Sequence, residues 1–202
     1  MGKIIEFEGI DGSGKSTQAL SLYRTLTALR IPVELITSKQ KMLSEPILAF
    51  LRQTGAQPIE MITLLSAAND LSLAERLKEP EKVFILDRYI YTSIAAYDVM
   101  RPGSDWAFCL YQPFQQPDLV INLDIPPEIA AERKEGNFNP FEEGSSLIYR
   151  DTHFSGFLDF QSRMRNSYLG LAQKVPNFRV LDGQRSELDL KEQIADLVSV
   201  LG

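Results

Sequence analysis

The sequence predicts a three-layered α/β protein in which helices cover both faces of a mostly parallel sheet. Three observations support this fold class. Short apolar runs, typical of buried strands, alternate along the chain with longer segments of helical periodicity. Such alternation is typical of strand–helix–strand crossovers, which join parallel strands and place helices on the sheet faces. The length of 202 residues suits a single domain over residues 1–202.

The expected strands are short runs rich in β-branched or aromatic residues. Four of them span residues 4–7, 83–86, 119–123 and 178–181, and residues 33–37 form a fifth, weaker candidate. Each run is bounded by Gly, Pro or acidic residues, which is typical of strand ends. The sequence therefore predicts about five strands, with helical segments between most of them.

Apolar residues recur at helical spacing in four segments, residues 19–29, 61–71, 157–171 and 190–201. In the second segment we expect one apolar face to pack on the core, formed by Met61, Leu64, Leu65, Ala68 and Leu71. Residues 39–46 fit no period and are predicted to be a loop that leads into a short helix. Residues 134–151 contain Gly136, Pro140 and Gly144 and lack apolar periodicity, so we expect a lid, because unstructured connections above ~12 residues are usually functional.

Composition excludes several classes of protein. The chain has 27 acidic and 21 basic residues and a formal net charge of −6, which argues against binding nucleic acid or anionic lipid. Its single cysteine, Cys109, excludes an internal disulfide and a multi-thiolate zinc site, and its apolar neighbours predict that it is buried. No apolar run approaches the ~18 residues of a membrane span, and no signal peptide precedes the first strand, so we expect a soluble, cytoplasmic protein.

A phosphate-binding loop is predicted at residues 9–16, which satisfy the pattern G-x-x-x-x-G-K-S. The pattern follows a predicted strand and precedes a helix, so backbone N–H groups and the helix N-terminus can face phosphate oxygens. Lys15, expected to be exposed in the loop, would reach the β- and γ-phosphates, and Ser16 would ligate Mg²⁺. The residues predicted here to bind a nucleoside triphosphate, which the resemblance described below implies is ATP, are Gly9, Asp11, Gly12, Ser13, Gly14, Lys15, Ser16 and Thr17.

A second candidate site follows the predicted strand 83–86. Asp87 would lie at the carboxyl end of a parallel strand, where a Mg²⁺ shell or a reacting group belongs. Arg88 can donate a forked pair of hydrogen bonds to the phosphate of an acceptor. The sequence has no N-K-x-D or T-K-x-D pattern of a GTPase and is short for a motor ATPase. These features favour a kinase.

Three segments, residues 7–18, 87–93 and 117–133, resemble the thymidylate kinase family in order and spacing. The second reads D-R-Y-I-Y-T-S, and the third begins P-D-L and ends with Ala130 and Arg133. The resemblance implies a sheet of order 2-3-1-4-5 and a transferase of nucleotide biosynthesis. It also implies ATP and Mg²⁺ as cofactors, a deoxynucleoside monophosphate as acceptor, with dTMP the first choice, and a homodimer.

The resemblance also implies roles for individual residues. Lys15, Asp87 and Arg88 would be catalytic, with Asp87 acting on Mg²⁺ through water beside Ser16 and Arg88 holding the acceptor phosphate. Asp11 would accept a hydrogen bond from the 3′-hydroxyl of the acceptor. Ser93 would lie near the base, and Arg133 and Gln184 would lie toward the adenine. No general base is needed, because the acceptor is already an anionic phosphate.

The base pocket and the lid depart from the family pattern. Ser66 and Asp70 stand where many members carry an aromatic residue and an arginine, and Ala96, followed by Tyr97, stands where a tyrosine crowds the ribose. Asp70 and Tyr97 are therefore candidate acceptor contacts. An Asp70 that faces the base would favour a cytosine nucleotide, because it can accept from the exocyclic amine, whereas an Asp70 that faces solvent would leave dTMP favoured.

The expected lid offers only two basic residues, Lys134 and Arg150, so the cation for the transferred phosphate would come from Arg150 or from Arg133. Two alternatives remain open. One is a P-loop kinase for another nucleotide or nucleoside. The other is a paralogue that binds ATP without transferring phosphate.

Overall fold

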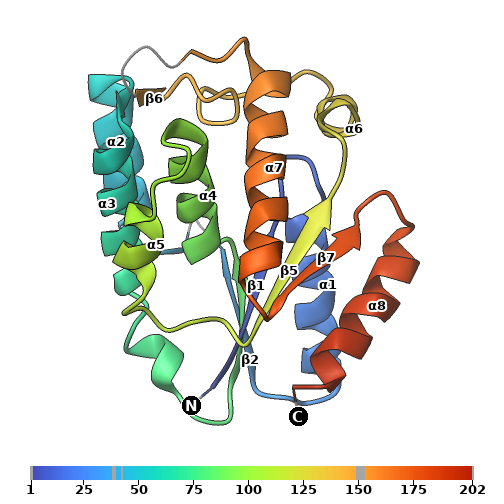
Figure 1. Ribbon diagram of the computed structural model, residues 1–202. Helices are drawn as coiled ribbons and strands as arrows, with labels where there is room; N and C mark the ends of the chain where they lie inside the picture. Colours follow the sequence, from blue (N-terminus) through green and yellow to red (C-terminus); the bar gives the residue numbers. More distant parts are fainter. Residues whose placement is uncertain (1, 38–39, 42, 149–152, 202) are drawn as a thin grey trace.

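The computed structural model describes residues 2–37, 40–41, 43–148 and 153–201 and has a five-stranded parallel sheet as its middle layer (Figure 1). The strands are β1 (Lys3–Glu8), β2 (Val33–Thr37), β4 (Val83–Asp87), β5 (Leu119–Asp124) and β7 (Phe178–Asp182). Their order in the sheet is β2-β4-β1-β5-β7, and every pairing is parallel. The predicted fold class is confirmed.

The predicted strand order differs from the structure in detail, because two further short strands form a sheet of their own. These are β3 (Gln57–Pro58) and β6 (Leu147–Ile148), which pair in parallel. When only the five long strands are counted along the chain, the order is 2-3-1-4-5. The small sheet joins the expected lid to the start of α3 (Ile59–Leu71). The sequence did not predict this contact.

Helices cover both faces of the large sheet (Figure 1). On one face lie α1 (Lys15–Ala28) and α8 (Glu187–Ser199), whose apolar side chains pack with Ile5 and Phe7 of β1. The other face carries α4 (Ile90–Met100) and α7 (Phe157–Lys174). The remaining helices are α2 (Ser44–Thr54), α3 (Ile59–Leu71), α5 (Trp106–Tyr111) and α6 (Pro127–Arg133), with a 3₁₀ turn at Arg76–Lys78.

Helix α3 is oriented opposite to the prediction. Leu64 and Leu71 of the expected core face are 50% and 57% exposed, whereas the polar Thr63, Asn69 and Asp70 are buried. The inner face of α3 combines the core residues Ile59 and Ala67 with Asn69 and Asp70, which line a cavity, so Leu64 and Leu71 are left on the outside. Cys109 is exposed rather than buried, because the short helix α5 turns Ala107 and Tyr111 inward instead.

Among the helices of the described ranges, none combines the length and the hydropathy that a bilayer crossing requires.

Candidate functional site

The predicted phosphate loop connects β1 to α1, and two of its glycines are required by close packing. Gly9 has a φ of 140°, and a Cβ at this position would lie 2.7 Å from the carbonyl oxygen of Leu123. Gly12 has a φ of 89°, and its Cβ would lie 2.8 Å from the carbonyl oxygen of Ala130 on α6. A side chain at either position would therefore displace the backbone of β5 or α6. The loop is held against both elements.

A first cavity of about 590 Å³ lies along this loop. Its lining includes Asp11, Gly12, Ser13, Gly14, Lys15, Ser16, Thr17 and Arg133 from the predicted ATP-binding set, together with Lys134, Gly183 and Arg185. Two predicted residues are not brought to it. Gly9 lies behind the loop, and Gln184 is exposed beside its lining neighbours Gly183 and Arg185. Neighbouring residues of a turn point in different directions, and a motif match cannot resolve which one faces the cavity.

Arg133 joins the loop to the turn after β7. Its Nη1 lies 3.5 Å from the carbonyl oxygen of Gly12 and 3.4 Å from that of Ser13, and its Nη2 donates to the carbonyl oxygen of Gly183 at 3.0 Å. Arg133 thus lines the first cavity, and its predicted contact with ATP on the adenine side stays a prediction. In this arrangement the guanidinium holds backbone carbonyls on both sides of the cavity.

Lys15 is buried, which corrects the expectation that it is exposed in the loop. Only 6% of the residue is accessible, its Nζ donates to the carbonyl oxygen of Ile10 at 3.1 Å, and it lies 3.6 Å from Oδ1 of Asp11. Burial, and next the charge of Arg88, lower the pKa of Lys15 to about 8, against the opposing effect of nearby carboxylates. Lys15 is thus a fixed ammonium at the base of the loop.

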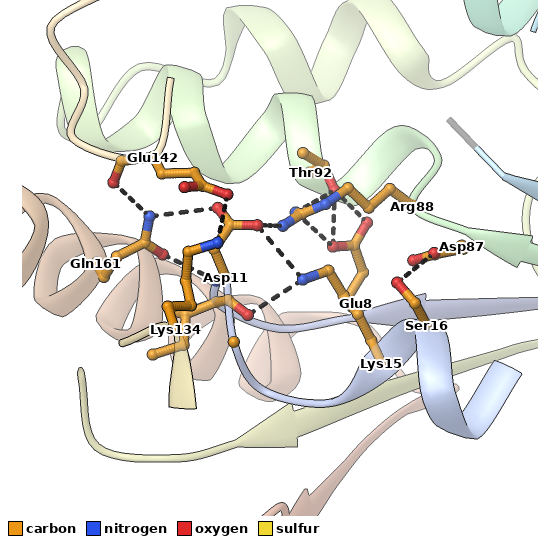
Figure 2. Close-up of polar contacts among 12 residues, drawn as sticks. Glu8, Asp11, Lys15, Ser16, Asp87, Arg88, Thr92, Lys134, Glu142 and Gln161 are labelled. Atoms are coloured by element: carbon orange, nitrogen blue, oxygen red, sulfur yellow. Dashed lines mark hydrogen bonds and ion pairs between the residues drawn. The ribbon is translucent and has the colours of Figure 1, made fainter. Parts of the chain in front are cut away.

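Ser16 and Asp87 form a pair of oxygen donors at the carboxyl end of β4. The hydroxyl of Ser16 donates to Oδ2 of Asp87 at 2.6 Å (Figure 2). Hydroxyl and carboxylate oxygens suit Mg²⁺, which keeps several waters and binds few protein ligands. Within the described residues no group of three or more His, Cys, Asp or Glu could hold a metal ion. This donor set fits an ion that takes its other ligands from water and phosphate.

A second cavity, of about 550 Å³, lies between α3, α4, α7 and the expected lid. Asp11 lines this cavity as well as the first, so the two meet at its carboxylate. The predicted acceptor contacts Asp70, Arg88 and Ser93 also line it. Tyr97 does not: it is buried against Trp106, with ring centroids 4.8 Å apart, and its neighbour Ala96 faces the cavity instead. The prediction for Tyr97 is wrong by one helical position, which is a rotation of about 100°.

Arg88 and Asp11 form an ion pair where the cavities meet (Figure 2). Nη2 of Arg88 lies 2.5 Å from Oδ1 of Asp11, and Nη1 donates to the hydroxyls of Thr92 and Tyr168 at 3.3 and 3.4 Å. Burial alone would raise the pKa of Asp11, but the charges of Arg88 and Lys15 outweigh it and lower that pKa to about 2. Asp11 is therefore ionised, and its Oδ1 lies between the ammonium of Lys15 and the guanidinium of Arg88.

Gln161 of α7 is a site residue that the sequence reading missed. It is 1% exposed, its Oε1 accepts from the N–H of Asp11 at 3.1 Å, and its Nε2 donates to the carbonyl oxygen of Glu142 at 2.7 Å. It thereby links the phosphate loop to the expected lid (Figure 2). A polar residue within the apolar stripe of the predicted helix 157–171 was the available signal.

Asp70 faces the second cavity from α3 and is paired with Lys41. The two side chains form a buried ion pair, with Asp70 2% and Lys41 8% exposed. Burial raises the pKa of Asp70, and the ammonium of Lys41 offsets part of that rise. Nζ of Lys41 also lies 5.6 Å from the ring centroid of Tyr89. Lys41 belongs to a segment without periodicity, and nothing in the sequence marked it as a site residue.

The expected lid contributes a charged pair at the border of both cavities. Nζ of Lys134 lies 2.9 Å from Oε1 of Glu142, and the two residues line the first and the second cavity respectively. Lys134 is therefore already paired with a carboxylate. Arg150, the other predicted lid cation, lies outside the described residues, as does Asp151 at the end of the predicted segment.

Comparisons with known proteins agree with this geometry. The family model described as thymidylate kinase matches residues 7–194. A probable thymidylate kinase of Saccharolobus solfataricus is 31% identical, over 98% of this chain and 97% of its own. The thymidylate kinase of Schizosaccharomyces pombe is 30% identical, over 98% and 92%. The solved thymidylate kinase of Candida albicans shares the fold, with a TM-score of 0.73 and 22% identity over 98% of this chain and 92% of its own. This chain belongs to the thymidylate kinase family.

Proposed function

We propose that the protein transfers the γ-phosphate of Mg·ATP to a deoxynucleoside monophosphate and that the acceptor is dTMP. The observation that carries this proposal is the meeting of the two cavities at Asp11, with Lys15 on one side and Arg88 on the other. A donor in the first cavity and an acceptor in the second would bring their phosphates together between these two cations. The names of the curated relatives support dTMP as the acceptor.

In this proposal the chain positions the substrates and stabilises charge. Lys15 and the loop amides would hold the donor phosphates, and Arg88 would hold the acceptor phosphate and offset the charge between the phosphoryl groups. Ser16 and Asp87 would hold Mg²⁺, which supplies further positive charge to the phosphate oxygens when bound. Asp11, ionised and fixed by Gln161, would accept a hydrogen bond from the 3′-hydroxyl. A general base is unnecessary, because the attacking phosphate is already an anion.

The Lys41–Asp70 pair bears on the identity of the acceptor. An unpaired Asp70 in the cavity wall would repel the O4 carbonyl of thymine and favour the exocyclic amine of cytosine. Lys41 neutralises that carboxylate and adds N–H donors beside it. The Lys41 ammonium can donate hydrogen bonds and the Asp70 carboxylate can accept them. This pair suits the edge of thymine, which presents carbonyl oxygens beside an N–H group. This compensation is the reason for proposing dTMP although Asp70 lines the cavity.

The test is a coupled ADP-release assay with dTMP, dUMP, dCMP, UMP and CMP. We expect the highest kcat/KM with dTMP. Lys41→Met leaves Asp70 unpaired and should shift the ratio of dCMP to dTMP activity by about ten- to a hundred-fold toward dCMP. Lys191→Met, on the exposed side of α8, is the matched control and should leave the ratio unchanged.

A wild-type preference for another nucleotide would overturn dTMP as the acceptor. ATP binding without activity on any of the five would favour a non-catalytic paralogue.

We further propose that residues 134–151 act as a lid of a single domain that spans the whole chain. Two contacts support this proposal. The bond from Gln161 to the Glu142 carbonyl connects the segment to α7, and the pairing of β6 with β3 connects it to the strand directly before α3; both helices line the second cavity. A bisubstrate mimic that joins adenosine to the acceptor nucleotide through phosphates should slow proteolysis within this segment. Cleavage at the loop over residues 102–105 serves as the reference. Equal rates with and without the mimic would mean that the segment is a static loop.

We also propose a cytoplasmic homodimer, in which the outer face of α3 meets a second copy. Leu64 and Leu71 are half exposed on this face, and the neighbouring helix α5 adds Trp106, which is 38% exposed. Sedimentation equilibrium should give a dimer that the double variant Leu64→Glu/Leu71→Glu converts to a monomer. Leu188→Glu, on α8 and 64% exposed, is the control and should leave the dimer intact. A monomeric wild type would refute this interface.

A further inference from the structure

We infer that Glu8 is a positioning residue that fixes the direction of the Arg88 guanidinium through the hydroxyls of Thr92 and Tyr168. The inference rests on the proposed function, since it assigns a role in presenting Arg88 to the acceptor phosphate. Glu8 does not line either cavity, so it would act on the acceptor through the lining residues that it contacts, Arg88, Thr92 and Tyr89.

Glu8 is the last residue of β1 and is fully buried. Both of its carboxylate oxygens lie 2.7 Å from the Thr92 hydroxyl, and Oε2 accepts from the Tyr168 hydroxyl at 2.9 Å. Its Oε2 also lies 3.9 Å from Nη1 of Arg88. The carboxylate thus sits behind the guanidinium, on the side away from the cavities, with the two hydroxyls between them (Figure 2 for Thr92).

The hydroxyl protons have a defined direction in this arrangement. Each hydroxyl has one proton to donate, and an ionised carboxylate can only accept. When Thr92 and Tyr168 donate to Glu8, their lone pairs remain for Nη1 of Arg88, which lies 3.3 and 3.4 Å away and can only donate. If the protons pointed the other way, they would meet the guanidinium N–H groups. Glu8 therefore makes both hydroxyls acceptors for Arg88.

A second carboxyl, that of Glu6, is buried beside Glu8. Glu6 is two residues earlier on the same face of β1, is fully buried, and accepts from the N–H of Tyr91 at 3.0 Å. Burial, and next the carboxylate of Glu8, raise the pKa of Glu6 well above its usual range. Glu6 therefore holds a proton more tightly than a free carboxyl does, and it is Glu8, not Glu6, that lies beside the guanidinium of Arg88.

Arg88 is consequently held from two sides. Asp11 binds Nη2 from the side of the phosphate loop, and the Glu8 assembly binds Nη1 from within the core. Arg88 also has a φ of 71°, a left-handed conformation that is uncommon for residues other than glycine. Loss of the inner support would leave the charge of Arg88 in place but release its orientation.

The experiment compares Glu8→Gln with Glu6→Gln in the full-length protein. A glutamine at position 8 has the same shape but accepts through only one of its two terminal atoms. If its NH2 group takes the place of Oε2, the Tyr168 hydroxyl must reverse. If it takes the place of Oε1, it occupies a lone pair of Thr92 and faces the Tyr89 N–H, which Oε1 now accepts. We expect kcat/KM for dTMP to fall about ten- to a hundred-fold, while the Kd of ATP stays unchanged. Glu6→Gln replaces the carboxyl with the raised pKa by an amide of the same shape in the same buried strand, and it should have little effect on either constant. Tyr168→Phe removes one of the two hydroxyls that lie between Glu8 and Arg88, and it should cause part of the loss seen for Glu8→Gln.

A double-mutant cycle provides the decisive readout. In an Arg88→Lys background, where the fork is already lost, Glu8→Gln should cause almost no further fall in kcat/KM. Additive losses, or equal losses for Glu6→Gln and Glu8→Gln, would overturn the inference and indicate a general effect of disturbing the buried strand. If Glu8→Gln fails to fold, Tyr168→Phe in the two backgrounds gives the same comparison. A wild-type protein that uses no monophosphate refutes the proposed function itself, which is a separate outcome.

Discussion

Replacing Lys15 with methionine is expected to lower kcat by about a hundred- to a thousand-fold, the range found when a group that stabilises transition-state charge is removed. Lys15 is buried at the base of the phosphate loop, where its ammonium lies beside Asp11. Methionine keeps most of the apolar stem and fills the space, so the fold should survive the loss of charge. Steady-state turnover and the thermal unfolding midpoint, measured on the same preparation, separate the two effects.

The lowered pKa of Lys15 allows a second, independent test of the same residue. Because that pKa is about 8, Lys15 is increasingly neutral in the free protein above pH 8, whereas bound phosphates favour the charged form. ATP binding above pH 8 should therefore take up a proton, and the Kd of ATP should rise with pH. Calorimetry in two buffers of different ionisation enthalpy measures the uptake, which Lys15→Met should abolish. Unchanged turnover in the folded variant would contradict the assignment of the donor site.

Replacing Arg88 with alanine is expected to reduce kcat/KM for the acceptor by about 30- to 1000-fold, corresponding to about 2–4 kcal/mol of transition-state stabilisation. The guanidinium lines the second cavity. Among the described residues that line this cavity, Lys41 is the one other basic residue, and it is paired with Asp70. The Kd of ATP should change little, because the first cavity is lined without Arg88.

Arg88→Lys serves as the conservative comparison. It keeps a positive charge but cannot form the planar fork, so its activity should lie between those of the wild type and Arg88→Ala. Separate titrations of ATP and dTMP distinguish the roles. Equal losses of affinity for both substrates would mean that Arg88 holds the site together rather than binding the acceptor.

The sequence predicted the features that depend on neighbouring residues. The strands and the phosphate loop were predictable because apolar runs and the spacing of Gly14, Lys15 and Ser16 are local patterns. Helix α3 was also detected, but its orientation was wrong. Periodicity identifies an apolar face without showing whether that face packs inward. On α3 the inward face carries Ile59 and Ala67 of the core together with Asn69 and Asp70, which line the second cavity.

The parts of the site that were missed depend on contacts between distant segments. Gln161 reaches Asp11 across 150 positions, and Lys41 meets Asp70 across 29. Polar residues of this kind look like ordinary surface residues until the fold buries them. Glu6 and Glu8 did leave a signal, since two acids alternate on one face of an otherwise apolar strand. A buried strand that carries charge at every second position should prompt a search for its partners.

The contact between Gly12 and α6 limits how this enzyme can be re-engineered. The Ala130 carbonyl oxygen occupies the space into which any side chain at position 12 would project. An arginine grafted there would push away the helix that also carries Arg133, whose guanidinium holds the carbonyls of Gly12 and Ser13. A designer who wants another cation beside the phosphates must therefore introduce it from a segment outside the loop, or redesign α6 at the same time.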